Sequence, residues 1–166
     1  KAVNCENPQD GNPCNCCRAC VAIDSGSCMD VLEIDAASNN GVENIREIIS
    51  DVSYSPANGR YKVYIIDEVH MLSIGAFNAL LKTLEEPPEY AIIILLTENA
   101  DGLLSTIRSR CVMLKLRNIK DKLVKKYLIE ELQIPDYQAE ICAAFAQGNV
   151  GRAIMLAKSE EFNEIK

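Results

Sequence analysis

Two adjacent carboxylates, Asp67 and Glu68, directly follow a short apolar stretch of the chain. Residues 63–66 read VYII, an uninterrupted apolar run with β-branched members, which predicts a strand buried on both faces of a parallel sheet. Open α/β sheets bind their ligands at the carboxyl ends of the strands, so one of these two carboxylates can hold a divalent metal while its neighbour orients or deprotonates an attacking water. Paired acids after a strand are also typical of solvated loops and helix caps, and spacing alone leaves both interpretations open.

A second candidate site is a cysteine cluster near the N-terminal end. Cys14, Cys17 and Cys20 follow a C-x₂-C-x₂-C rhythm, and Cys5 precedes them across ENPQDGNP, whose Pro and Gly residues can turn the chain back. Four thiolates so spaced predict a closed tetrahedral zinc site at about residues 5–20, with a structural role. Disulfides are disfavoured by the apparent cytoplasmic setting, and a bacterial iron–sulfur run would need a further cysteine at position 24.

The other four cysteines receive separate predictions. Cys16 could displace a neighbour as a zinc ligand, because it lies between two of the predicted ligands. Cys28 is predicted to be a spare thiol. Cys111 and Cys142 lie in apolar stretches and are predicted to be core residues.

Composition and charge restrict the classes of function. The 166 residues carry a formal net charge of −7, which argues against a strong non-specific grip on DNA by this chain alone. Eight basic residues nevertheless stand between positions 108 and 126 against one acid, and a solvated helix face is favoured for them over a phosphate-binding patch. The sequence contains neither an apolar run of about 18 residues nor the apolar segment of a signal peptide, so a cytoplasmic protein is expected, with no membrane partner.

The expected elements alternate up to about residue 117. Strands are predicted at residues 31–35, 63–66, 91–97 and 112–116, which gives an α/β fold with a mainly parallel sheet. One helix is expected to begin at a capping Asn40 with Glu43 three residues later, and its apolar positions are Val42, Ile45, Ile49 and Val52. A second helix is expected to begin at Ser73 and to end before two prolines, and its apolar positions are Phe77, Leu80, Leu81 and Leu84.

From residue 118 the pattern is helical only. Three helices are predicted, at residues 120–132, 136–147 and 151–158, separated by Pro135 and Gly148. The predicted organisation is therefore an α/β domain over residues 1–117 and a helical domain over residues 118–166. The boundary lacks a Gly/Ser linker, so a hinge is expected there.

Several motifs together resemble the clamp-loader branch of the AAA+ ATPases, whose members include the gamma/tau and delta-prime subunits of bacterial DNA polymerase III. The resemblance covers nearly the whole chain. It rests on the four-cysteine module and on four segments that occur in the family's order: EIDAASNNGVENIREI at residues 33–48, DEVHML at residues 67–72, FNALLKTLEEPPE at residues 77–89 and SRC at residues 109–111.

This resemblance implies roles for particular residues. Asp67 and Glu68 would be the Walker B carboxylates, Thr97 the sensor 1 residue, and Arg110 an arginine finger that reaches the γ-phosphate held by a neighbouring subunit. The cysteines match the family's zinc module, which implies structural Zn²⁺, with ATP and Mg²⁺ bound in the full-length protein. The implied partners are other clamp-loader subunits in a hetero-oligomeric ring, the sliding clamp, and primed DNA bound through the assembly.

The chain departs from the family pattern at two places. The G-x-x-x-x-G-K-[ST] loop that precedes the zinc module in the family is absent from this sequence, so a P-loop NTPase core without its first strand and P-loop is expected, and the chain alone is not expected to hydrolyse ATP. In the lid, the sensor 2 arginine aligns with Gly151, one position before Arg152. A shift of one residue turns a side chain by about 100° around a helix.

Other interpretations remain open on sequence grounds. Arg110 could be an ordinary surface or strand-flanking arginine, Thr97 could satisfy a nearby backbone group, and His70 is interpreted as a helix-entry or packing residue. The chain could also be a non-hydrolysing delta-prime-type subunit or a zinc-stabilised interaction module. A DExH-type helicase shares residues 67–70, but a chain of this length leaves little room for a second motor domain.

Overall fold

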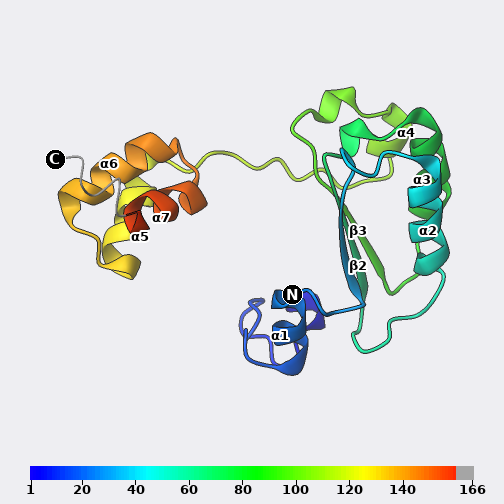
Figure 1. The fold of residues 1–166 in the computed structure, drawn as a ribbon, viewed down its shortest axis with the longest axis horizontal. Coiled ribbons are helices and arrows are strands. Elements are labelled where there is room, and N and C mark those ends of the chain that lie inside the picture. The colour runs from blue at the N-terminus through cyan, green and yellow to red at the C-terminus, as the bar shows by residue number, and fades with distance from the viewer. Residues whose placement is uncertain (160–166) are drawn as a thin grey trace. The chain divides into compact units, whose positions relative to one another are not determined.

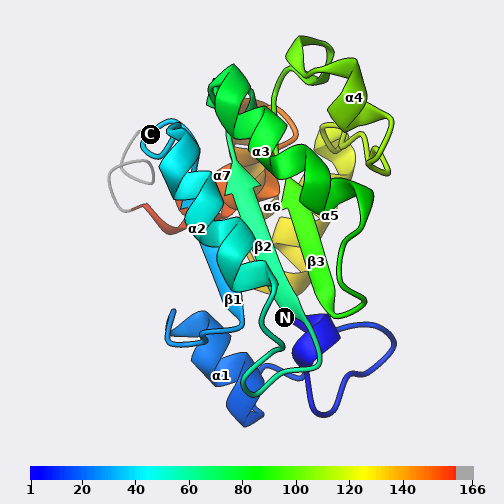
Figure 2. The same cartoon turned by 90° about the vertical axis from the view of Figure 1, so that its right-hand side faces the viewer.

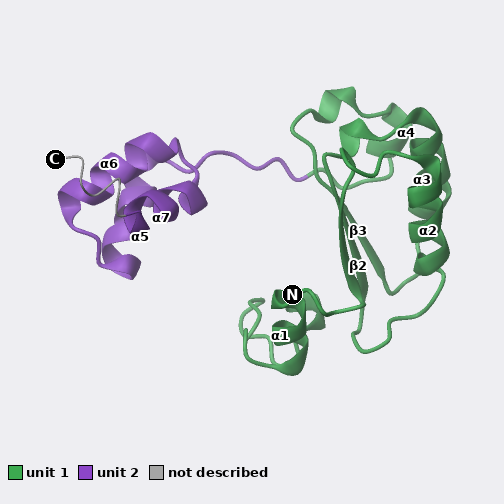
Figure 3. Ribbon diagram, in the orientation of Figure 1, with its two compact units in different colours: residues 1–113 green, residues 114–166 purple. Residues whose placement is uncertain are grey.

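The computed structural model describes residues 1–159, and the chain divides into two compact units, Lys1–Met113 and Leu114–Lys166 (Figure 3). Each unit has a hydrophobic core of its own. The first unit is α/β and the second is helical. The predicted boundary at residues 117/118 falls four positions further along the chain, and residues 160–166 of the predicted helical domain lie outside the described residues.

The first unit is built on a three-stranded parallel sheet in the order β1-β2-β3. β1 (Val31–Asp35) pairs with β2 (Lys62–Asp67), and β2 pairs with β3 (Ala91–Leu95). The three strands lie where the β-branched apolar runs predict them, and the prediction of a parallel sheet is confirmed. Parallel pairing matters for the site, because all three carboxyl ends meet at one edge of the sheet.

Two helices, α2 (Val42–Val52) and α3 (Ile74–Glu85), cover one face of this sheet (Figures 1 and 2). Their predicted apolar positions enter the core, where Ile45 of α2 and Leu80 of α3 are almost fully buried against Ile66 of β2. Burial of this kind stabilises a fold by about 25 cal/mol for each Å² of apolar surface removed from water.

The sequence predicted the N-cap residue of one of these helices correctly and that of the other wrongly. Ser73 caps α3 as predicted, with its hydroxyl oxygen accepting the N–H of Ala76 at 3.3 Å. The predicted cap at Asn40 is wrong, because α2 begins one residue later and its N-cap is Gly41. The carbonyl of Asn40 instead accepts the N–H of Ser73 at 3.2 Å, so this residue joins the beginnings of the two helices.

The opposite face of the sheet is partly open at its outer strands. Ile94 of β3 is 39% exposed and Leu32 of β1 is 41% exposed, whereas Val63, Tyr64 and Ile66 of β2 are buried, as predicted for that run. Both long helices of this unit lie on the other side, and the open face borders a groove lined in part by Val3 and Ile23. The uninterrupted apolar run at residues 63–66 therefore marks a largely buried central strand, whereas the outer strands keep some apolar side chains accessible.

The predicted strand at residues 112–116 is wrong. These residues have no regular structure, and their apolar side chains point into solvent, with Val112 89% and Leu116 91% exposed. A strand needs a neighbouring edge to supply its hydrogen bonds. Within residues 1–159, this segment pairs with neither outer edge of the sheet, at β1 or at β3, and so has no ladder partner.

The loop that leads into β2 is held by two side chains from earlier in the chain. The buried carboxylate of Asp30 accepts the N–H groups of Ala57, Asn58 and Gly59 at 2.6, 2.8 and 2.7 Å. Asn4, in the 3₁₀ turn Ala2–Asn4, exchanges hydrogen bonds with the backbone of residues 60 and 61. The N-terminal segment is thereby fixed to the start of β2.

The second unit contains α5 (Asp121–Leu132), α6 (Asp136–Ala146) and α7 (Val150–Lys158), close to the three predicted helices. Its core is formed by small and apolar residues that include Val124, Leu128 and Cys142. Gly148 separates α6 from α7 with φ +81°, and a Cβ there would lie 2.5 Å from the carbonyl oxygen of Ile119. Within residues 1–159, no helix combines the length and the apolar character needed to cross a membrane.

Candidate functional site

The carboxyl edge of the sheet brings residues from β2 and β3 together. Backbone pairing continues past the strands, because Leu96 donates to the carbonyl of Ile66 and accepts from the N–H of Val69, each at 2.9 Å. Asp67 ends β2 beside Asp35 of β1, and Thr97 follows β3. The residues just past the ends of β2 and β3 therefore lie at the same edge of the sheet.

Glu68 adopts a left-handed backbone conformation, with φ 48° and ψ 40°. Its N–H donates to the Oδ1 of Asp67 at 2.8 Å, so the two carboxylates diverge from one tight turn. This conformation is uncommon for a residue with a Cβ, and such strain is found disproportionately at functional sites. The side chain of Glu68 stays partly accessible, with 38% of its surface exposed, as a group that must meet water or ligand requires.

His70 links the two sides of this edge. It lies in η2, the 3₁₀ turn Val69–Met71, and its Nδ1 is 3.2 Å from the Oε2 of Glu68 and 3.2 Å from the Oγ1 of Thr97. The sequence reasoning interpreted it as a packing residue and missed both contacts. The alignment of the two predicted parallel strands could have revealed them, since residues just past the ends of neighbouring parallel strands are close in space.

Thr97 also makes a backbone contact. Its Oγ1 accepts the N–H of Asn99 at 3.1 Å, which is the strand-end role considered from the sequence. Because the oxygen is the acceptor in this contact, the hydroxyl proton of Thr97 remains available for an acceptor of its own. The same oxygen also faces the Nδ1 of His70.

Arg110 is engaged within its own unit. It follows the short helix α4 (Ser105–Arg108), its Nη1 donates to the carbonyl of Thr106 at 2.8 Å, and its Nη2 forms an ion pair with Glu85 at the end of α3. Both partners leave the side chain about one-third exposed, so its fork can be reached from outside.

Arg152 lies in the second unit, on the first turn of α7. Asn149 caps this helix by accepting the N–H of Arg152 at 2.9 Å, and the residue itself is exposed.

The four predicted zinc ligands come together. The Sγ atoms of Cys5, Cys14, Cys17 and Cys20 all lie within 4.8 Å of one another, and Cys5 and Cys17 are 4.0 Å apart at sulfur. Zn–S bonds of about 2.3 Å in a tetrahedron place sulfurs about 3.8 Å apart, so the shell suits one metal ion. Cys16 is exposed and is not part of this group, and all eight cysteines are free thiols rather than disulfides.

Backbone N–H groups near these cysteines lower the pKa of the Cys14 and Cys17 thiols and so favour their thiolates. N–H groups of Cys14, Cys17 and Cys20 donate to the sulfurs of Cys5, Cys14 and Cys17, at 3.3, 3.3 and 3.4 Å. Backbone donation from residues 16 and 17 lowers the pKa of Cys14 to about 6, whereas burial raises the pKa of Cys20 to about 12. Zinc binding would displace the remaining protons, which makes metal affinity pH-dependent.

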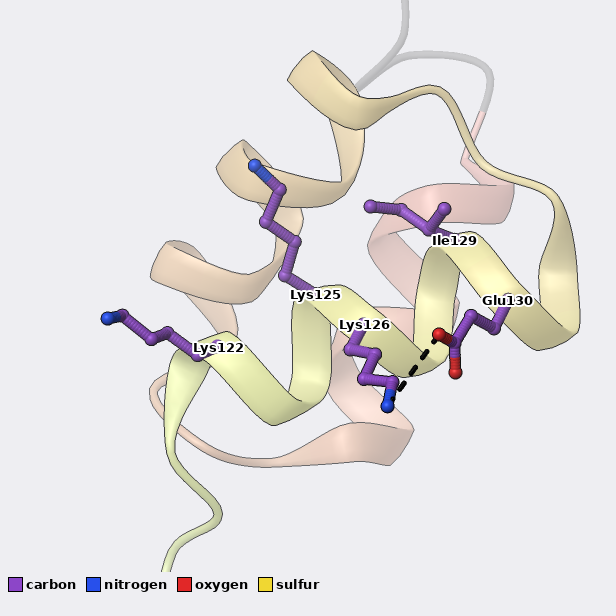
Figure 4. Close-up of a pocket in the computed structure, with 5 residues that line it drawn as sticks. All are labelled: Lys122, Lys125, Lys126, Ile129 and Glu130. Carbon is purple, nitrogen blue, oxygen red and sulfur yellow. Dashed lines mark ion pairs between the residues drawn. The ribbon is translucent and has the colours of Figure 1, made fainter.

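Several basic residues of the run between residues 108 and 126 are paired with acids in their own unit. Arg108 pairs with Asp101, Lys125 with Asp136 and Glu140, and Lys126 with Glu130 on the same helix, α5. Figure 4 shows a shallow hollow on α5 in which Lys126 turns toward Glu130. The solvated helix face that the sequence favours agrees with this arrangement.

Comparisons with known proteins match this chain to subunits of DNA polymerase III. The family described as "DNA polymerase III, delta subunit" matches residues 1–120. The DNA polymerase III subunit tau of Bacillus subtilis is 51% identical over 161 residues, which are 94% of this chain and 29% of that protein. The subunit gamma of Buchnera aphidicola from Acyrthosiphon pisum is 44% identical over the same share of this chain and 45% of its own length. The chain thus spans less than half of these relatives.

Solved structures give the same picture. A DNA polymerase III gamma subunit-related protein of Thermotoga maritima superposes with a TM-score of 0.54 at 34% identity, over 81% of this chain and 49% of that one. The RuvB Holliday junction branch migration motor of the same organism superposes with a TM-score of 0.63 at 21% identity, over 84% of this chain and 47% of that one. At that identity the second likeness concerns the fold alone.

The parallel sheet with acids at its carboxyl edge, joined to a cysteine cluster and C-terminal helices, defines an α/β protein related in fold to RuvB and other AAA+-like proteins. The high identity to tau and gamma subunits narrows this class. The chain belongs to the DNA polymerase III gamma/tau subunit family.

Proposed function

We propose that this chain is the part of a DNA polymerase III clamp-loader subunit that senses and hydrolyses ATP once the P-loop is supplied. Residues 1–117 would be a AAA+ nucleotide-binding domain without its first strand and P-loop, carrying an inserted zinc module, and residues 118–166 would be a helical lid. The complete ring of subunits would use ATP to open a sliding clamp and place it on primed DNA.

The observation that carries this proposal is the placement of Asp67 and Glu68 at the end of β2 and of Thr97 just past β3, at one edge of the sheet, with His70 within 3.2 Å of both Glu68 and Thr97. Glu68 would act as the general base that orients and activates water, and Asp67 would hold Mg²⁺. The metal supplies charge neutralisation for the phosphate oxygens when it is bound. The hydroxyl of Thr97 would donate to a phosphate oxygen and so report nucleotide, as a sensor 1 residue does.

Arg110 is proposed to act in trans. An arginine fork stabilises the charge that develops on a transferred phosphoryl group, and fingers of this kind raise the rate by about 10³-fold or more. The partial exposure of Arg110 supports a role toward a neighbouring subunit. Arg152 is proposed as the nucleotide-contacting arginine of the lid, from its place at the start of α7.

The cysteine cluster is proposed to hold one structural Zn²⁺. Its four sulfurs leave no coordination position for substrate, which is the arrangement of structural rather than catalytic zinc. The ion would stabilise the N-terminal module that Asn4 fixes to the start of β2.

The test uses the full-length protein in a reconstituted assembly with its sibling subunits, the clamp and primed DNA. Glu68→Gln should abolish DNA-stimulated ATP hydrolysis while ATP binding persists. Arg110→Ala should reduce hydrolysis strongly, whereas Arg108→Ala, which removes a nearby paired charge, should leave it within about twofold. Full hydrolysis in Glu68→Gln, or failure of the assembly to bind the clamp, would refute the proposal.

A second candidate is a delta-prime-type subunit that supplies Arg110 without hydrolysing ATP itself. It is favoured by the match of residues 1–120 to the family described as the delta subunit. In this case Glu68→Gln would have no effect on the assembled ring while Arg110→Ala would still impair it. ATP binding to the full-length subunit, measured together with its zinc content, separates the candidates before any ring is assembled.

A further inference from the structure

The imidazole of His70 lies between two groups to which the proposed function gives different roles, the general base Glu68 and the sensor residue Thr97. Its Nδ1 is 3.2 Å from an oxygen of each. The turn that carries it is well fixed, because the preceding Val69 is fully buried and donates its N–H to the carbonyl of Leu96 at 2.9 Å. The position of the ring is therefore set by the same backbone pairing that joins β2 to β3.

One nitrogen cannot serve both neighbours in the same way. When Nδ1 carries a proton, it donates to the carboxylate of Glu68, and the hydroxyl proton of Thr97 is left for another acceptor. When Nδ1 is bare, it accepts that hydroxyl proton, and its lone pair then faces the carboxylate oxygen, which loses its donor. The two hydrogen-bond arrangements exclude each other.

We infer that His70 is a positioning residue that couples the hydroxyl of Thr97 to the orientation of Glu68. This inference rests on the proposed function. A phosphate oxygen that accepts the Thr97 proton leaves Nδ1 without a donor, and the imidazole changes to the tautomer with a proton on Nδ1. That proton holds one oxygen of Glu68, and the other oxygen is directed toward water. Without nucleotide, Thr97 donates to Nδ1 and Glu68 is released.

The proton balance of this change is closed. Nε2 gives up one proton to solvent and Nδ1 takes one from solvent, so the change is a tautomerisation with no net proton gained or lost. The side chain of His70 is 31% exposed, which allows this exchange.

Kinetics in the reconstituted assembly provide the first test. His70→Ala should lower kcat about tenfold with little change in KM for ATP, because a base that is no longer oriented affects the chemical step more than binding. His70→Asn places an amide donor near the position of Nδ1 and should recover most of the rate. His70→Gln places it near Nε2 and should not. Met71→Ala, an exposed change in the same turn, is the matched control and should be silent.

The outcomes separate the inference from the function on which it rests. An active Glu68→Gln enzyme means that the proposed function fails. An inactive Glu68→Gln enzyme together with wild-type kcat in His70→Ala overturns the inference alone. Equal recovery by the Asn and Gln variants overturns it as well, because a space-filling role would not distinguish the two nitrogens.

Imidazole ¹⁵N NMR of the full-length subunit gives a readout independent of turnover, with the His70 signals assigned by their loss in His70→Asn. Thr97→Val removes the donor to Nδ1 and should shift the ring toward the tautomer protonated on Nδ1. Glu68→Gln removes the carboxylate acceptor and should shift the ring the other way. Opposite shifts support the coupling, and unchanged signals in both variants overturn it.

Discussion

The guanidinium of Arg110 is paired with the carboxylate of Glu85, which ends α3 within the same unit. A residue proposed to reach into a neighbouring subunit is thus already held by a partner in its own chain. This pair has to open, or Glu85 has to move with it, before the fork can meet a phosphate. The contact places a small free-energy cost on the trans interaction, because a partly exposed ion pair contributes about 0.2 to 1 kcal/mol.

Glu85→Gln should therefore release Arg110 and raise ATP hydrolysis by the reconstituted ring about two- to fivefold, the range that corresponds to such a pair. Steady-state ATPase assays measure this. Glu86→Gln, at the adjacent exposed position, is the control and should have no effect. A loss of activity in Glu85→Gln would instead mean that Glu85 aims the fork toward its target.

Cys20→Ser should remove the metal from the N-terminal module, because Cys20 is the most deeply buried of the four clustered thiols and a hydroxyl is a poor zinc ligand. Metal content by mass spectrometry should fall from about one zinc per chain to well below that. Cys16→Ser should retain the metal, since Cys16 lies outside the cluster. Equal loss in both variants would place Cys16 among the ligands.

Asp30→Asn should destabilise the loop before β2. Burial raises the pKa of Asp30, but the three backbone N–H groups and Lys62 outweigh it and hold the pKa below its usual value. A carboxylate whose pKa is lower in the folded state contributes stability above its unfolded pKa of about 3.9, and that stability is lost as pH falls through the folded pKa. The free energy of unfolding of the variant should thus be about 2 kcal/mol lower than that of the wild type at pH 7, and this difference should shrink progressively below pH 4.

Hydrogen exchange of the amides of Ala57, Asn58 and Gly59, with zinc held constant, measures this loss locally. Asp101→Asn is the control, because its carboxylate is almost fully exposed, and it should change stability by less than about 0.5 kcal/mol. A difference between Asp30→Asn and wild type that grows as pH falls would contradict the assigned role.

Gly75→Ala should destabilise the packing of α3 on α2. A Cβ at Gly75 would lie 2.7 Å from the Cγ2 of Val42, and a β-branched side chain has little rotamer freedom with which to move away. The expected cost is about 1 to 2 kcal/mol of unfolding free energy, measured by denaturant titration. In a Val42→Ala background the same substitution should be nearly neutral, and an unchanged cost there would exclude this contact as the cause.

Strand positions and the cysteine cluster could be predicted from the sequence because both are encoded locally. Apolar β-branched runs placed β1, β2 and β3, and the spacing of the cysteines identified the sulfurs that meet. The segment at residues 112–116 has an alternating pattern that also predicts a strand, but it has no ladder partner among the described residues and did not form one. Periodicity describes what a segment can become, and pairing depends on the rest of the sheet.

The contacts of His70 and Arg110 could not be predicted for a related reason. Each depends on which residues lie beside it across the fold, Thr97 in one case and Glu85 in the other. These partners are far away in the sequence, and no short motif encodes them. The left-handed turn at Glu68, which brings its carboxylate to the imidazole, was equally invisible, since nothing in the residue type demands it.

The cysteine cluster has a consequence for the order of folding. Its ligands lie within residues 5–20, so closing the site requires only short loops, whereas Asn4 reaches its partner at Tyr61 across 57 residues. The proposed Zn²⁺ could thus be captured while β2 and β3 are still emerging from the ribosome. The zinc-bound module would then offer Asn4 as a preformed docking point for the loop that leads into β2, and under this proposal zinc supply during synthesis would be a condition for efficient maturation of the chain.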